Sequence, residues 1–212
     1  MKQIKLHGIT QMQSIGGTDS WYFAMDYTSG DLYEAEELYQ NGHEVKSNHL
    51  YLIHYPDGEI FEPIHPEIHC YFGTPIFYED AIYILCVDFG KQQIRIHRFD
   101  GSAGTVTEIQ CIPLNQVDDC YNLMLHKSPP MLTRQSAENQ FEIIWPEQVE
   151  FGIHPRESFV FREEDKLYFS MWHEDPEYRE EIVVRSLMDG EIIEKYDGSI
   201  MEMSNGEWWH LK

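Results

Sequence analysis

The sequence predicts an all-β fold built from five repeats of a four-stranded antiparallel unit. In each repeat, a run of β-branched, aromatic and aliphatic residues begins at a turn and reads as a strand. An alternating strand, a tight turn and a further strand follow most of these runs, and a shorter apolar strand precedes them. One residue marks the recurring run in each repeat: Tyr22, Tyr83, Leu132, Tyr168 and Trp209.

The strands and turns of the repeat have recognisable signals. The runs 80–88 and 165–173 are apolar on both faces, which is typical of strands covered on two sides. Asp-Gly pairs stand at or near three of the turns that follow, and Asp-Gly tolerates the positive φ of tight hairpins. These pairs are Asp57-Gly58, Asp100-Gly101 and Asp189-Gly190.

Units of this size with four strands each are typical of β-propeller blades. The chain therefore resembles a five-bladed β-propeller with about 42 residues per blade, in a single domain over residues 1–212. The alternating stretch 3–7 is expected to complete the last blade, because this closure removes an exposed sheet edge. An antiparallel β-sandwich or barrel is the alternative fold.

One insert interrupts the repeat between the second and third strands of the first unit. Residues 31–41 are predicted to form a short helix, with Asp31 as the N-cap and Glu34 three residues later. Gly42 suits the end of the helix. The same residues also resemble the strand marker, so a strand is the alternative.

The charge of the chain excludes two classes of partner. Asp and Glu number 37 and Lys and Arg 15, which gives a formal net charge of −22. Such a surface repels phosphate, so neither nucleic acid nor a membrane is expected as a partner. The hydrophobic fraction of 42% is that of a globular chain and not of a disordered acidic one.

The cysteines and the N-terminus indicate a cytoplasmic protein. Cys70, Cys86, Cys111 and Cys120 form no CxxC pair and match no zinc framework. Cys86 lies in an apolar run, where a buried reduced thiol is expected. No secretory signal or membrane-spanning run is recognised. We therefore predict a soluble cytoplasmic protein with free thiols.

The first loop between repeats carries the candidate metal ligands. His65, Glu67 and His69 alternate along the chain, so an extended backbone would place all three on one face. Two imidazoles and a carboxylate suit Zn²⁺ or Fe²⁺. The alternative is a loop whose histidines cap backbone groups. The main prediction assigns no metal or other cofactor, and His65 and His69 remain candidate ligands only.

Two further loops between repeats carry polar side chains that are expected at one mouth of the central channel. With the first loop, they make up the predicted binding site, and carboxylates brought together there would raise one another's pKa. The alternative is that an acidic composition places some carboxylates at any mouth. These residues are Asp118, Asp119, His154, Arg156 and Glu157.

Two of these carboxylates resemble residues of the five-bladed glycosidases, the arabinanase, xylosidase and invertase-like enzymes. Those enzymes carry a carboxylate near the start of the inner strand in each of the first three blades. Glu157 looks like their general acid and Asp119 like their second aspartate. Their first aspartate has no counterpart, because residues 7–14 contain no acid. The resemblance therefore lacks the base that two-carboxylate hydrolysis needs.

The main functional prediction is a non-catalytic binding or scaffold module. Its ligand is expected to be a neutral or cationic small molecule, a glycan or a protein. The alternatives are a glycosidase-like hydrolase using Asp119 and Glu157, and a metal-dependent enzyme using His65 and His69. No GxSxG, P-loop or GxGxxG motif is present. Trp208 and Trp209 are interpreted as packing residues, with stacking on a sugar as the lesser alternative.

Overall fold

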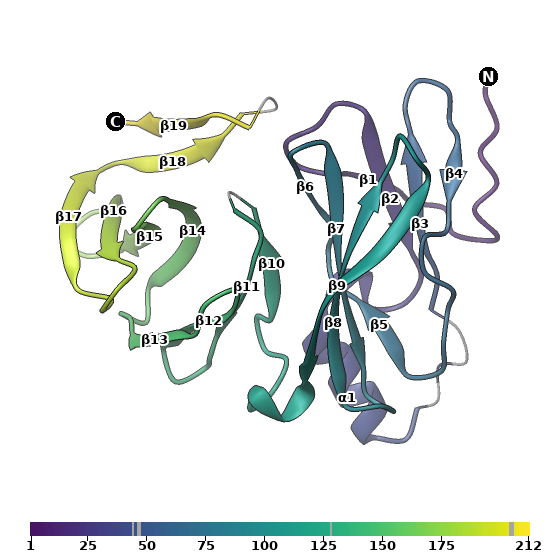
Figure 1. Cartoon of the computed structure of the whole chain (residues 1–212). Coiled ribbons are helices and arrows are strands. Elements are labelled where there is room, and N and C mark those ends of the chain that lie inside the picture. Colours follow the sequence, from purple (N-terminus) through teal and green to yellow (C-terminus); the bar gives the residue numbers. More distant parts are fainter. Residues whose placement is uncertain (44, 46–47, 128, 204–205) are drawn as a thin grey trace. The chain divides into compact units, whose positions relative to one another are not determined.

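The computed structural model describes residues 1–43, 45, 48–127, 129–203 and 206–212 of the chain. It contains two compact units, Met1–Leu125 and His126–Lys212, which are described one at a time (Figure 1). That residues 1–212 make up a single domain stays a prediction.

The first sheet of unit 1 is an antiparallel meander in which each strand pairs with the next along the chain. Trp21 and Phe23 face a core shared with the second sheet, whereas Tyr22 and Ala24 face a smaller cluster. Both faces of β2 are therefore covered by apolar side chains. The strands are β1 (Gln13–Ser14), β2 (Trp21–Met25), β3 (Leu50–His54) and β4 (Ile60–Phe61).

The second sheet has five strands in four positions. β5 and β6 pair one after the other with the edge of β7 that β8 leaves open. Phe72, Ile82, Ile84 and Phe99 of this sheet complete the core that it shares with the first sheet. The strands are β5 (Cys70–Phe72), β6 (Ile76–Tyr78), β7 (Ala81–Asp88), β8 (Gln93–Asp100) and β9 (Thr105–Pro113).

A disulfide joins Cys70 of β5 to Cys86 of β7, so the prediction of a free thiol is wrong for both residues. The register places Phe72 opposite Cys86, which makes the two cysteines diagonal neighbours with a Cα–Cα distance of 6.6 Å. That separation lies within the reach of a disulfide. Cys111 and Cys120 keep their thiols.

The insert in the first repeat forms the predicted helix, α1 (Leu32–Gln40). The Asp31 carboxylate accepts hydrogen bonds of 3.0 Å from the backbone N–H groups of Tyr33 and Glu34, as an N-cap does. Leu32 and Ala35 are buried. Two short 3₁₀ turns, η1 (Thr28–Gly30) and η2 (Leu114–Gln116), complete the helical segments of the described chain.

Two further antiparallel meanders belong to unit 2, the first of which starts at β10 on the boundary of the units. Phe141 of the third sheet and Phe169 of the fourth are fully buried in the core that these sheets share. The third sheet contains β10 (Met124–His126), β11 (Met131–Gln135), β12 (Gln140–Trp145) and β13 (Val149–Gly152). The fourth contains β14 (Glu157–Glu163), β15 (Lys166–His173), β16 (Arg179–Ser186) and β17 (Ile192–Asp197).

The chain is thus an all-β protein with a propeller-like succession of four blades, and the predicted number of five is wrong. Tyr22, Tyr83, Leu132 and Tyr168 each lie on the second strand position of a sheet, β2, β7, β11 and β15. The fifth marker, Trp209, lies instead in a two-stranded hairpin of β18 (Ser199–Glu202) and β19 (Trp208–Leu211). These separate sheets also differ from the alternative of a single barrel.

The predicted closure by residues 3–7 is also wrong, because they form no strand and β18 and β19 pair only with each other. Leu6 is buried against Ala24, Tyr51 and Ile53 on the first sheet. The Lys2 ammonium donates to the backbone carbonyl of Pro56 at 2.9 Å. Burial of Leu6 therefore holds the N-terminal segment on the first sheet of its own unit.

One of the three predicted Asp-Gly turns has a different reason for its glycine. Gly58 and Gly190 have positive φ values of 70° and 72°, as tight turns demand. Gly101 instead packs against Trp21, where a Cβ would lie 2.3 Å from the indole Cζ2. A side chain at this position would displace a buried tryptophan.

We expect Gly101→Ala to lower the free energy of unfolding by about 1–3 kcal/mol, the usual cost of overpacking a core. Gly152→Ala is the matched control, because its Cβ would meet only the Gln140 side chain at 3.9 Å. Urea denaturation of both variants measures the difference. Equal stabilities would contradict the close packing of Gly101 on Trp21.

No helix in the described part of the chain has the length and apolar character needed to cross a membrane.

Candidate functional site

The loop between β4 and β5 carries the predicted metal ligands His65, Glu67 and His69. The Glu67 carboxylate is paired with the Lys91 ammonium and lies 4.0 Å from the Arg95 guanidinium. His69 has a positive φ of 65°, which breaks the extended alternation needed to align the three side chains. Among the described residues, no three His, Cys, Asp or Glu side chains form a group that could hold a metal ion. This loop gives the metal-dependent alternative no support.

The second predicted loop, after η2, contains Asp118 and Asp119. An Asp119 carboxylate oxygen accepts a hydrogen bond of 2.9 Å from the backbone N–H of Tyr121, which stabilises a local turn. Asp118 is exposed. Both residues belong to unit 1, whereas the third predicted loop belongs to unit 2. The mouth that the loops would form together stays a prediction.

Glu157, the predicted general acid, is a buried partner of Arg185. Its side chain is 2% exposed, and its two carboxylate oxygens accept hydrogen bonds of 2.9 to 3.1 Å from the Arg185 guanidinium. The backbone N–H of His154 donates to the same carboxylate at 3.3 Å. A general acid must reach the substrate, and here both oxygens are already occupied. This arrangement favours a structural role and not the hydrolase alternative.

The other residues of the third loop are used locally. The His154 ring accepts a hydrogen bond of 3.2 Å at Nδ1 from the backbone N–H of Arg156. The Arg156 guanidinium lies 5.0 Å from the ring centroid of Trp172. Both side chains of this loop therefore have partners close to them in the same unit.

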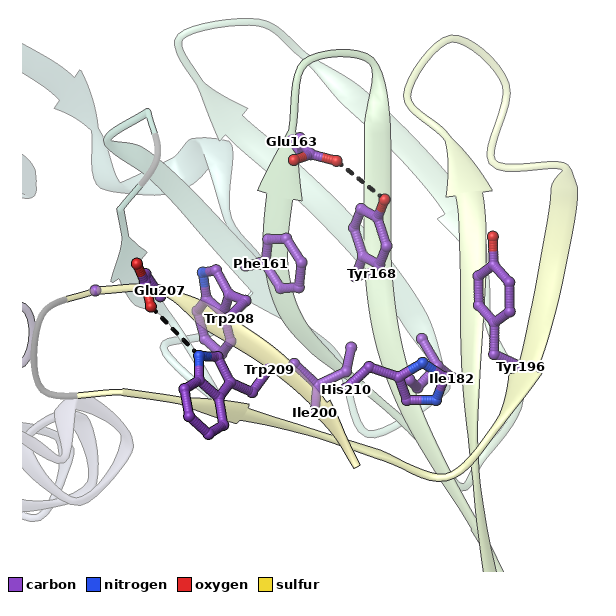
Figure 2. A pocket seen from close by; sticks show the side chains of 11 residues that line it. Phe161, Glu163, Tyr168, Ile182, Tyr196, Ile200, Glu207, Trp208, Trp209 and His210 are labelled. Carbon is purple, nitrogen blue, oxygen red and sulfur yellow. Dashed lines mark hydrogen bonds between the residues drawn. The ribbon is translucent and has the colours of Figure 1, made fainter. Parts of the chain in front are cut away.

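The strongest candidate site is a pocket that the sequence analysis did not assign. It lies in unit 2, between one face of the β14–β17 sheet and the β18–β19 hairpin, and has a volume of about 430 Å³ (Figure 2). A volume of this size suits a small organic ligand. The lining residues are Phe161, Glu163, Tyr168, Ile182, Tyr196, Ile200, Gly206, Glu207, Trp208, Trp209 and His210.

A β-bulge places Phe161 in this pocket. Phe159 pairs with Phe169, but the register shifts by one residue, so Phe161 pairs with Tyr168. Phe159 packs against the buried core of unit 2, whereas Phe161 stacks on Tyr168 with the ring centroids 4.3 Å apart. Bulges re-aim side chains in this way. The sheet therefore has aromatic residues on both faces, one set in the core and the other in the pocket.

The hairpin adds a third ring to this stack. The Trp208 indole lies parallel to Phe161 at 4.5 Å, with an interplanar angle of 9°. Because Tyr168 is also parallel to Phe161, the Phe161 ring lies between the other two (Figure 2). Side chains alternate along a strand, so Trp208 and His210 face the sheet and Trp209 faces away. The stack attaches the hairpin to the sheet and forms one wall of the pocket.

The opposite wall is Tyr196 of β17. Its ring centroid lies 5.9 Å from that of His210, and the residue is 40% exposed. Ile182 pairs with Tyr196 and is 2% exposed, so it lies at the base of the sheet face between the two walls. The pocket is thus bounded by Tyr168 on one side and Tyr196 on the other, with an aliphatic floor (Figure 2).

Hydrogen-bond donors of the pocket are already paired with acceptors. The Tyr168 hydroxyl donates to the Glu163 carboxylate at 3.2 Å. On the outer face of the hairpin, the Trp209 indole N–H donates to Glu207 at 3.3 Å. Nε2 of His210 donates to the backbone carbonyl of Asp197 at 2.8 Å. Burial, together with the charge of Glu163, raises the pKa of the Tyr168 phenol, which keeps it protonated as a donor. The polar surface left for a ligand consists mainly of carboxylate oxygens.

The charge at the pocket is negative. Glu163 and Glu207 are among its lining residues, and none of the lining residues that the structure describes is a Lys or an Arg. Lys166, which lies on the same strand as Tyr168, pairs with the Glu194 carboxylate at 2.9 Å. The Tyr196 hydroxyl also donates to Glu194. A cationic ligand would therefore meet no Lys or Arg side chain among the described lining residues that could repel it.

Only some residues of this pocket could be recognised from the sequence. Tyr168 and Trp209 appeared as strand markers, and Trp208 as a packing residue. The position of Phe161 depends on a bulge, which a strict two-residue alternation does not anticipate. Two adjacent tryptophans on a C-terminal strand were the visible clue, since one of them must leave the core face.

No protein-family model matches this chain, and no curated protein is significantly similar to it in sequence. The function must therefore be argued from the site itself.

Proposed function

We propose that the protein is a non-catalytic binding module whose unit 2 pocket takes a small neutral or cationic ligand. The observation that carries the proposal is the set of rings on the sheet face opposite the core, under the β18–β19 hairpin. Aromatic side chains that are not needed for the core, arranged around a pocket, are typical of ligand sites. The proposal moves the site from the predicted channel mouth to this pocket.

The charge of the lining limits the class of ligand. Glu163 and Glu207 repel phosphate and carboxylate groups, and the net charge of −22 acts in the same direction. Ring faces attract apolar and cationic groups. Sugars and organic cations both fit this description, whereas nucleotides and organic acids do not.

The hydrogen bonds of the carboxylates explain why we propose no catalytic reaction. Glu163 is bound to a phenol and Glu207 to an indole N–H. The glycosidase-like pair is not favoured either, because Glu157 is occupied by Arg185. Binding requires only the ring faces and the charge of the pocket, whereas catalysis would also require an acid or base that can reach the substrate.

The proposal is tested by saturation-transfer NMR and tryptophan fluorescence with N-acetylglucosamine, cellobiose and choline chloride. We expect at least one compound to bind the wild-type protein with a Kd in the millimolar range or below. Trp208→Ala should weaken that binding about tenfold or more, because the stacked wall is lost.

Two variants control for indirect effects. Trp208→Phe keeps an aromatic ring on Phe161 and should restore most of the affinity. Trp172→Ala removes a tryptophan that is 42% exposed on the same sheet but does not line the pocket. If none of the three compounds binds, or if Trp172→Ala and Trp208→Ala weaken binding equally, the proposed site is wrong.

A further inference from the structure

We propose that the ligand of the unit 2 pocket is an organic ammonium ion with small alkyl groups on its nitrogen. This inference rests on the proposed function and narrows it to one chemical class. Three features of the pocket support it: the width between its walls, the pairing of its donors and its charge.

The width follows from the strand positions. Tyr168 of β15 pairs with Val184 of β16, whereas Tyr196 of β17 pairs with Ile182, so the two tyrosines share a face but are offset by two residues along the strands. Two strand spacings of about 4.8 Å and two residue rises of about 3.4 Å place their backbones about 12 Å apart. A nitrogen midway would lie about 6 Å from each tyrosine, at the limit of about 6 Å for a cation–π interaction.

The pairing of donors distinguishes an ammonium ion from a sugar. A sugar hydroxyl both donates and accepts hydrogen bonds, and a specific sugar site offers partners for both roles. Here the Tyr168, Tyr196 and His210 donors are all bound to protein acceptors. The pocket therefore offers ring faces and carboxylates, which an alkylated ammonium ion can use without any acceptor of its own.

The negative charge of the pocket is the third feature that supports an ammonium ligand. The Glu163 carboxylate lies at the hydroxyl edge of the Tyr168 ring, where the phenol donates a hydrogen bond to it. A negative carboxylate near the ring adds an ionic attraction to the cation–π interaction. Since Lys166 is already paired with Glu194, it does not cancel this attraction.

The test compares choline with its neutral isostere 3,3-dimethylbutan-1-ol, in which carbon replaces the charged nitrogen. Isothermal titration calorimetry of the full chain should show choline binding at least tenfold more tightly than the isostere. Raising NaCl from 20 to 200 mM should weaken choline binding severalfold, because surface charge is screened. Both compounds have the same shape, so the difference reports the charge alone.

Substitutions test whether choline binds in the unit 2 pocket. Tyr196→Ala should weaken choline binding at least fivefold, and Glu163→Gln should weaken choline but not the isostere. Tyr178→Ala, which removes a tyrosine that is 68% exposed and outside the lining, should change neither. Far-ultraviolet circular dichroism checks that each variant keeps the wild-type fold.

The failures of the two proposals are distinguishable. Equal binding of choline and the isostere, or binding of cellobiose or N-acetylglucosamine but not choline, overturns the ammonium inference and leaves the binding pocket in place. Absence of binding by all four compounds overturns both. Choline binding that Tyr196→Ala and Glu163→Gln leave unchanged also overturns the inference, because the cation then binds elsewhere.

Discussion

Arg185→Met should lower the free energy of unfolding by about 3–5 kcal/mol, because it leaves the buried Glu157 carboxylate without its charged partner. Arg185 also donates to the backbone carbonyl of Gly190 at 2.6 Å, and its guanidinium lies 5.7 Å from the Phe151 ring centroid. The substitution thus removes a link between two strands together with an ion pair. Chemical denaturation measures the loss.

The matched control is Lys195→Met in the same sheet. Lys195 pairs with Glu181 at 2.9 Å, but its side chain is 45% exposed, so its removal should cost less than about 1 kcal/mol. Glu157→Gln should resemble Arg185→Met in direction. A Glu157→Gln variant as stable as the wild type would contradict the structural role and restore Glu157 as a candidate for catalysis.

Replacing Cys70 and Cys86 together by alanine should lower the free energy of unfolding by about 3 kcal/mol. The disulfide closes a loop with a sequence separation of 16, and a cross-link of this span stabilises mainly by restricting the unfolded chain. Cys111→Ser, at an exposed thiol, is the control and should change stability little. Denaturation with and without reductant provides the measurement.

A thiol count separates the bonded from the reduced form. Under denaturing conditions without reductant, the wild-type chain should show two reactive thiols, those of Cys111 and Cys120. Four thiols would contradict the disulfide. Because structural disulfides are rare in the cytosol, this bond is the observation most at odds with the cytoplasmic location, which stays a prediction.

Strand positions were predictable because apolar alternation and turn chemistry are local. The markers Tyr22, Tyr83, Leu132 and Tyr168 each fell on a second strand for this reason, and Asp31 capped its helix as predicted. The number of blades was not predictable from the sequence, because it depends on where the ends of the chain pack. Leu6 is buried on the first sheet, so residues 3–7 do not extend the hairpin that contains Trp209.

The candidate site was harder to predict because it depends on register and on distant pairing. The bulge between Phe159 and Phe161 turns one phenylalanine into the core and the other into the pocket. Arg185 pairs with Glu157 only because separate strands bring them together. Cys70 and Cys86 likewise become neighbours through the pairing of β5 with β7. Sequence spacing alone identifies none of these partners.

The most direct test of the ligand pocket is a crystal structure of the wild-type protein grown in the presence of choline chloride. The account predicts electron density for the trimethylammonium group between Tyr168 and Tyr196, above Ile182 and within contact of the Glu163 carboxylate. Choline bound at another place, or a pocket filled by protein side chains in the presence of saturating choline, would contradict it.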